Sequence, residues 1–238
     1  MKSQKLLSYT RRAITDYDMI SPGDKIAIGI SGGKDSLTLL YAMSKLKKFY
    51  PIPFEIEAIT VDLGFKDFDT SRLKEYCESL GVNYTVCKTH IGEIVFDYRK
   101  EPNPCSLCSR MRKGAFNDCA AELGCNKIAY AHHKDDVDSF LMSMLYEGRI
   151  HTFSPVTHLE KSGVTLIRPL IYALEGEIRA FARANDLPVC KNPCPADGVT
   201  KRQESKDIID ELKVRVPDVK DRIFSSIEGA GIDGWSRH

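Results

Sequence analysis

Apolar and polar positions alternate along the chain in a way that predicts strands and helices in turn. Short apolar runs typical of buried strands occupy residues 25–30, 54–62, 84–89, 127–131 and 164–167. Apolar residues at helical spacing fill the intervening segments 37–46, 71–80, 109–123, 136–146 and 175–185. This alternation predicts an α/β fold with a parallel five-stranded sheet and helices on both faces.

The remaining segments are predicted to be helical additions or irregular connections. Residues 1–22 form an N-terminal helix, 23–200 the main domain, and 201–238 a C-terminal extension of two polar helices. An irregular connection is expected over about 91–104, and a long turn-rich segment over 147–163.

Composition narrows the class of protein. The chain is 42% hydrophobic and 28% charged, as in soluble globular proteins, and its net charge of +1 creates no global field for a polyanion. The N-terminus lacks the apolar core of a signal peptide, and no stretch of 18 apolar residues exists, so we expect a cytoplasmic protein with no membrane partner. In that compartment the eight cysteines are expected to be thiols, metal ligands or catalytic groups rather than disulfides.

A glycine-rich turn between the first strand and the next helix is the clearest candidate for a phosphate site. Glycines permit tight backbone turns, and successive N–H groups at a helix start can cradle a phosphate. The loop is no Walker A motif, because Ile28 stands where that motif needs glycine and an aspartate follows the lysine. The residues expected to bind the nucleotide here are Ser31, Gly32, Gly33, Lys34, Asp35 and Ser36.

The segment SGGKDS resembles the signature SGGxDS of the PP-loop family. The resemblance implies an enzyme that cleaves ATP between its α and β phosphates, attaches AMP to a substrate oxygen and releases pyrophosphate. It also places Asp62, at the end of the second strand, beside the adenosine. The alternative is that Asp62 caps the following turn.

Two pairs of cysteines are candidate ligands. Cys105 and Cys108 form a CxxC motif, which serves zinc sites, redox dithiols and iron–sulfur clusters alike. Cys190 and Cys194 lie in a proline-rich segment. The other four are expected to be small core residues, namely Cys77, Cys87, Cys119 and Cys125.

Several stretches together resemble the tRNA 2-thiocytidine synthetase branch of the PP-loop family: NPCSLCSRMRKGA, AHHKDD, EGRI, LIRPLIY and NPCPADG. The resemblance implies a [4Fe-4S] cluster held by three cysteines, with the fourth iron left for sulfide. Carried over, the ligands are Cys105, Cys108 and either Cys190 or Cys194, and NPCPADG favours Cys194. The family has CxxC at this second position where this chain has CxxxC, so the third ligand stays open.

The segment after the fourth strand adds candidate acid–base and magnesium groups. Asp135 and Asp136 can hold Mg²⁺ or act as a base, and His132 can face the nucleotide. The alternative is that the aspartates only favour a helix N-terminus. Basic residues after the CxxC, Arg112 among them, could position RNA phosphates. The candidate catalytic residues are Lys34, Arg112, Asp135 and Cys194.

The leading hypothesis is an ATP-dependent tRNA sulfurtransferase that takes sulfur from sulfide or a cysteine desulfurase and works as a homodimer. Three alternatives remain. The substrate could be a small molecule, the protein could be a non-catalytic nucleotide- and metal-binding module, or the CxxC cysteines could carry a persulfide without a cluster.

Overall fold

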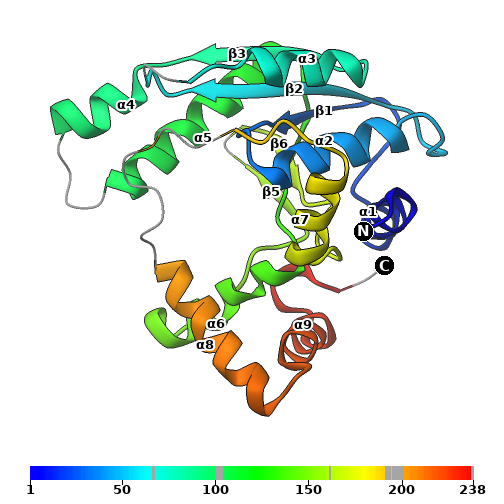
Figure 1. Ribbon diagram of the computed structural model, residues 1–238, viewed down its shortest axis with the longest axis vertical. Coiled ribbons are helices and arrows are strands. Elements are labelled where there is room, and N and C mark those ends of the chain that lie inside the picture. Colours follow the sequence, from blue (N-terminus) through cyan, green and yellow to red (C-terminus); the bar gives the residue numbers. More distant parts are fainter. Residues whose placement is uncertain (66–67, 100–103, 161, 191–193, 195–200, 237–238) are drawn as a thin grey trace.

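A six-stranded sheet forms the centre of the protein (Figure 1). The computed structural model describes residues 1–238 except 66–67, 100–103, 161, 191–193, 195–200 and 237–238. In spatial order the sheet runs β3-β2-β1-β4-β6-β5. The strands are β1 (Asp24–Gly29), β2 (Phe54–Asp62), β3 (Asn83–Lys88), β4 (Lys127–Ala129), β5 (Val156–Leu159) and β6 (Val164–Ile167).

The predicted α/β class is confirmed, but the predicted count of five strands is wrong. The first four strands and β6 pair in parallel, with Ile26 opposite Ile56 on one side and Lys127 on the other. The additional strand, β5, pairs antiparallel with β6 at the sheet edge, inside the segment predicted to be turn-rich. Its four residues are mostly half-buried and include an exposed histidine, so they lack the apolar run that marks a central strand.

Helices cover both faces of the sheet and bury two apolar cores. On one face α1, α2, α3 and α7 pack over a large core that includes Leu39, Leu73 and Phe181. On the other face α5 packs over β2 and β3, with Phe116 in a smaller core. These helices are α1 (Ser3–Asp16), α2 (Lys34–Leu46), α3 (Ser71–Ser79), α5 (Pro104–Glu122) and α7 (Glu175–Ala184).

Helical turns replace part of the irregular connection expected before the CxxC. A short helix α4 (Ile91–Glu93) continues into a π-helical stretch (Ile94–Arg99). Ile91 and Val95, four residues apart, are both buried there, which explains why this segment coils onto the protein. The next helix begins at Pro104, so the CxxC lies within its first two turns.

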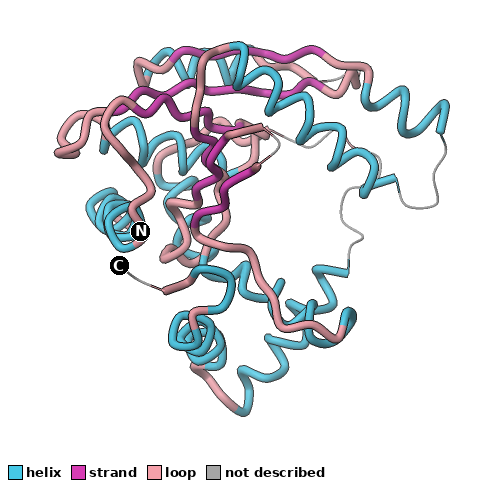
Figure 2. The backbone as a smooth tube through the Cα atoms, turned by 180° about the vertical axis from the view of Figure 1, so that it is seen from behind, coloured by secondary structure: helices cyan, strands magenta, loops and turns pink. Residues whose placement is uncertain are grey.

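A group of helices lies at the end of the molecule away from α3 and β3 (Figures 1 and 2). It comprises α6 (Asp138–Glu147), α8 (Lys201–Arg215) and α9 (Val219–Ala230), with a 3₁₀ turn (Lys134–Val137) before α6 and another (Ile232–Gly234) after α9. None of the helices in the described ranges combines the length and apolarity that crossing a bilayer requires.

Candidate active site

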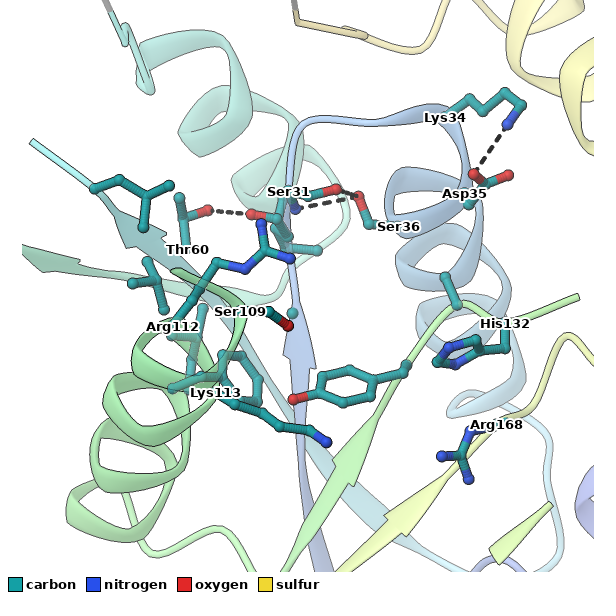
Figure 3. A pocket seen from close by; sticks show the side chains of 18 of the residues that line it. Ser31, Lys34, Asp35, Ser36, Thr60, Ser109, Arg112, Lys113, His132 and Arg168 are labelled. Carbon is teal, nitrogen blue, oxygen red and sulfur yellow. Dashed lines mark hydrogen bonds and ion pairs between the residues drawn. The ribbon is translucent and has the colours of Figure 1, made fainter. Parts of the chain in front are cut away.

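A cavity of about 680 Å³ opens where the strands β1, β2 and β4 end (Figure 3). In this sheet the order reverses at β1, because β2 lies on one side of it and the later strand β4 on the other. Open α/β sheets bind ligands at such a reversal, beyond the carboxyl ends of the strands. The wall is formed by residues of the loop 31–36, called the phosphate loop below, by the segment after β4 and by one side of α5.

The phosphate loop is held by its own serines. The hydroxyl of Ser36 donates to the carbonyl of Gly33 at 3.0 Å and accepts from the N–H of Ser31 at 3.3 Å. Gly32 has a φ of +78°, a backbone conformation that residues other than glycine rarely adopt. The loop therefore turns directly into α2, whose first N–H groups lie at the edge of the cavity.

Lys34 reaches the cavity wall but already has two carboxylate partners. Its ammonium lies 2.9 Å from Asp35 and 3.2 Å from Glu175 at the start of α7. Burial opposes the charged form, but the hydrogen bond and charge of Asp35, together with Glu175, outweigh it and raise the pKa of Lys34. The ammonium is thus charged at neutral pH, and an incoming phosphate would have to displace these carboxylates.

Asp62 does not line the cavity, whereas its neighbours Thr60 and Val61 do. The Asp62 carboxylate accepts a hydrogen bond from the N–H of Gly64 at 2.9 Å, as a turn-capping aspartate does. Thr60 belongs to the same segment at the end of β2, and its hydroxyl donates to the carbonyl of Ile30 at 2.8 Å and so joins β2 to the residue that precedes the phosphate loop.

The segment after β4 divides its polar residues between the cavity and the protein interior. His132, His133 and Asp136 line the cavity, and the Asp136 carboxylate accepts the N–H of His133 at 2.7 Å. Asp135 lies outside the lining, with one oxygen accepting the N–H of Glu175 at 2.6 Å. Its other oxygen pairs with Lys220 of α9 at 2.8 Å.

The surroundings of Asp135 hold it as a carboxylate. Burial opposes the charge, but the hydrogen bonds from Lys220 and from the N–H of Glu175 outweigh burial and lower the pKa of Asp135. Through these contacts Asp135 holds the start of α7 and the helix α9 in place, so its role in this structure is to stabilise the fold. The predicted catalytic role of Asp135 stays a prediction.

Three of the four candidate cysteine ligands share one electrostatic neighbourhood. Burial raises the pKa of Cys108, the nearby thiols of Cys194 and Cys105 add to this effect, and Arg112 opposes it. Cys105 is exposed, and Cys108 and Cys194 are half-buried. In the described portion of the chain no three His, Cys, Asp or Glu side chains already stand at metal-binding distance.

Cys190 lies elsewhere, against the phosphate loop. Its N–H donates to the carbonyl of Gly32 at 2.9 Å, and its thiol donates to the carbonyl of Pro188 at 3.4 Å. Burial raises its pKa, while the charges that act on it come from Arg72 and Asp69, on the other side of the loop.

The remaining cysteines lie in or against the two cores, as predicted. Cys77 belongs to the larger core, Cys119 and Cys125 are buried in the smaller one, and Cys87 packs against the latter.

One side of α5 brings basic groups to the cavity. Ser109, Arg112 and Lys113 all line it, directly after the helical turn that carries Cys105 and Cys108. Figure 3 shows Arg112 extending toward the phosphate loop. Residues three and four positions apart lie on one helix face, which explains why these three side chains reach the same cavity.

Arg168 is more buried than the other arginine and the lysines that line the cavity, and sequence reasoning did not select it. The residue follows β6, is 7% exposed, and lies beside His132 in Figure 3. Burial lowers its pKa to about 10, against the opposing charges of Tyr130 and Asp136. The stretch LIRPLIY contains Arg168, but nothing in the spacing of that stretch separates a cavity arginine from a surface one.

Comparison with known proteins agrees with this geometry. Residues 5–204 match the family model of the PP-loop domain. The tRNA-cytidine(32) 2-sulfurtransferase of Syntrophotalea carbinolica is 35% identical, over 94% of this chain and 88% of its own length. The enzyme of the same name from Anaeromyxobacter dehalogenans is 36% identical, over 94% of this chain and 78% of its own.

Solved structures extend the comparison to three dimensions. The U34-tRNA thiolase of Methanococcus maripaludis, solved with its [4Fe-4S] cluster, superposes with a TM-score of 0.75 at 27% identity, covering 96% of this chain and 79% of its own. An NH3-dependent NAD synthetase of Campylobacter jejuni shares the fold, with a TM-score of 0.52 at 17% identity over 98% of this chain and 97% of its own. The chain therefore belongs to the PP-loop family, in the group that includes the tRNA-cytidine(32) 2-sulfurtransferases.

Proposed function

We propose that this protein is an ATP-dependent tRNA sulfurtransferase that replaces the C2 oxygen of a cytidine by sulfur. One observation carries the proposal: α5 carries Cys105 and Cys108 near its start, and Ser109 and Arg112, directly after them on the same helix, line the nucleotide cavity. A group bound by those thiols would adjoin the place where ATP activates a substrate. Relatives named for this reaction match nearly the whole chain.

The reaction proceeds in two displacements. The C2 oxygen of the base bonds to the α-phosphorus of ATP, and pyrophosphate leaves. Sulfide sulfur then bonds to C2, and AMP leaves with the oxygen, so that a poor leaving group has become a good one. The phosphate loop binds the nucleotide through N–H groups at the start of α2, and Arg112 lies where it can offset the charge that develops on the phosphate.

Two carboxylates fit a magnesium ion on the phosphates. Asp35 and Asp136 both line the cavity, and Asp35 Oδ1 is enclosed without a hydrogen-bond partner among the described residues. Carboxylate oxygens are the ligands that Mg²⁺ prefers. The ion would neutralise charge on the departing pyrophosphate.

The cysteines fit an iron–sulfur cluster as a donor set. Cys105 and Cys194 both lie close enough to Cys108 to raise its pKa. The groups that act on the pKa of Cys190 are instead Arg72 and Asp69. We therefore assign Cys105, Cys108 and Cys194 as the ligands, with Cys190 as a support of the phosphate loop. When bound, the cluster would supply an iron position without a protein ligand, where sulfide can be held beside the activated base.

Further parts of the proposal rest on the family resemblance. We infer a cytoplasmic homodimer that receives sulfur as sulfide or from a cysteine desulfurase. Size-exclusion chromatography with light scattering tests the dimer, and a monomer at micromolar concentration would contradict it.

The test is iron and acid-labile sulfide content after anaerobic purification, for the wild type and for C105A, C108A, C190A and C194A. We expect about four irons per chain in the wild type and in C190A, and loss of iron in the other three. Loss in C190A with retention in C194A would move the third ligand. Finding zinc, or no metal at all, would contradict the cluster assignment. A separate assay measures ATP turnover, and turnover that tRNA does not stimulate would favour a small-molecule substrate.

A further inference from the structure

The guanidinium of Arg168 has hydrogen-bond partners at Nη1 but, among the described residues, none at Nε. Its Nη1 donates to the carbonyl of Ser154 and, at 3.1 Å, to the hydroxyl of Thr157. Its Nε is enclosed without a hydrogen-bond partner, and no hydrogen bond of Nη2 is seen within the described residues. The Nε–Nη2 edge is the one through which arginine binds a carboxylate or phosphate with two parallel hydrogen bonds.

Arg168 also lacks a carboxylate in direct contact. No ion pair joins it to a carboxylate among the described residues, although the charge of Asp136 acts on it. Its guanidinium lies over the ring of Phe153, 5.3 Å from the ring centroid. Lys34, by contrast, has Asp35 and Glu175 beside it. Burying a cation is costly unless it is paired, so a phosphate bound to Arg168 would offset part of that cost.

The place of Arg168 in the sheet separates it from the phosphate loop. It follows β6, whereas the loop follows β1, and β4 lies between these two strands. Figure 3 shows Arg168 with His132 on this far side of the cavity, while Arg112 and Lys113 approach from α5. An anion bound to Arg168 would thus lie across the cavity from the start of α2.

We propose that Arg168 is a phosphate-binding residue whose Nε–Nη2 edge holds a phosphate group on the β6 side of the cavity. The inference rests on the proposed function, which provides two sources of this chemistry. One is the pyrophosphate that ATP releases, and the other is a backbone phosphate of the RNA beside the target base. Lysine at this position keeps the charge but loses the two-pronged edge.

The experiment measures binding of two probes, inorganic pyrophosphate and unmodified tRNA, to the wild type, R168K and T157V. T157V is the matched control, because it removes one structural hydrogen bond of the same guanidinium and leaves the Nε–Nη2 edge intact. Circular dichroism and thermal unfolding of each variant establish that it is folded. Calorimetry gives the affinity for pyrophosphate, and fluorescence anisotropy gives the affinity for tRNA.

We expect R168K to weaken one probe by tenfold or more, while T157V stays within threefold of the wild type for both. Weakened pyrophosphate binding identifies the ATP phosphates as the source, and weakened tRNA binding identifies the RNA backbone. Retention of both affinities in R168K, or equal losses in R168K and T157V, would overturn the proposal. Neither binding assay requires sulfur transfer, so a negative result for Arg168 can be distinguished from a failure of the thiolation reaction.

Discussion

Replacing Lys220 by methionine tests how firmly α9 is docked to the segment after β4. The Lys220 ammonium lies 2.8 Å from the Asp135 carboxylate, and the two side chains are only 18% and 11% exposed. Breaking a buried ion pair from one side costs about 3–5 kcal/mol. Asp135 keeps the N–H of Glu175, and both side chains still touch water, so we expect a loss of about 2 kcal/mol in the free energy of unfolding.

The loss depends on pH in a direction that the pKa shifts fix. The folded-state pKa of Asp135 is lowered, so its contribution to stability is present above the pKa of about 3.9 in the unfolded chain and is lost as pH falls through the lower folded value. The pKa of Lys220 is raised against the effect of burial by its contacts with Asp135, so its contribution is full below about pH 10.4 and is lost as pH rises through the higher folded value. K220M should therefore differ most from the wild type between about pH 5 and 9.

Urea unfolding at pH 7 and at pH 3 measures both effects. The control is Lys74→Met, which removes an i,i+4 pair with Glu78 whose side chains are 65% and 62% exposed and which should cost less than about 0.5 kcal/mol. A K220M protein as stable as the control at pH 7, or equally weakened at both pH values, would refute the structural account of Asp135.

Three further predictions concern the loop, the C-terminus and the thiols. Gly32→Ala should raise the KM for ATP at least tenfold, since φ is +78° and a Cβ would stand 3.1 Å from the Cβ of Cys190; an unchanged KM would show that the loop tolerates the turn without glycine. Trp235→Ala should cost about 3–5 kcal/mol in urea unfolding, because the ring is 1% exposed and its N–H bonds to the carbonyl of Phe153, and a loss below about 1 kcal/mol would contradict that packing. In iron-free protein the alkylation rate of Cys108, followed by mass spectrometry, should still rise above pH 9, since its pKa is raised by burial and neighbouring thiols; a plateau below pH 8 would argue against that environment.

The sequence pattern predicted the central strands β1, β2 and β4 because most of their residues are buried. The run KIAIGI at 25–30 indicates a strand by itself, and the two glycines that follow indicate a turn, because glycine adopts the left-handed backbone conformations that tight turns need. The edge strand β5 escaped prediction because only one neighbour and one face stabilise it. Its pairing with β6 depends on tertiary contacts, and its three half-buried residues and one exposed histidine form no apolar run that would predict a strand.

The candidate site was predictable where its residues are contiguous and not where the fold brings them together. SGGKDS and CSLC are read directly from the sequence. Glu175, by contrast, reaches Lys34 only because α7 packs on α2, and Arg168 enters the cavity only because β6 pairs with β4. The sequence alone does not distinguish such residues, because most arginines and glutamates lie on the protein surface and nothing in the flanking residues marks these two as different.

The C-terminal extension is bonded into the site although the family match ends at residue 204. Lys220 holds Asp135 from one side. From the other, Trp235 donates to the carbonyl of Phe153, and the Phe153 ring stacks on His132 with centroids 5.0 Å apart. Because the segment after β4 is thus fixed at both its aspartate and its histidine, the orientation of the cavity-facing groups depends on residues beyond the family domain. Loss of the extension should therefore impair nucleotide binding as well as stability, and a fragment ending near residue 204 that still binds ATP with full affinity would contradict this coupling.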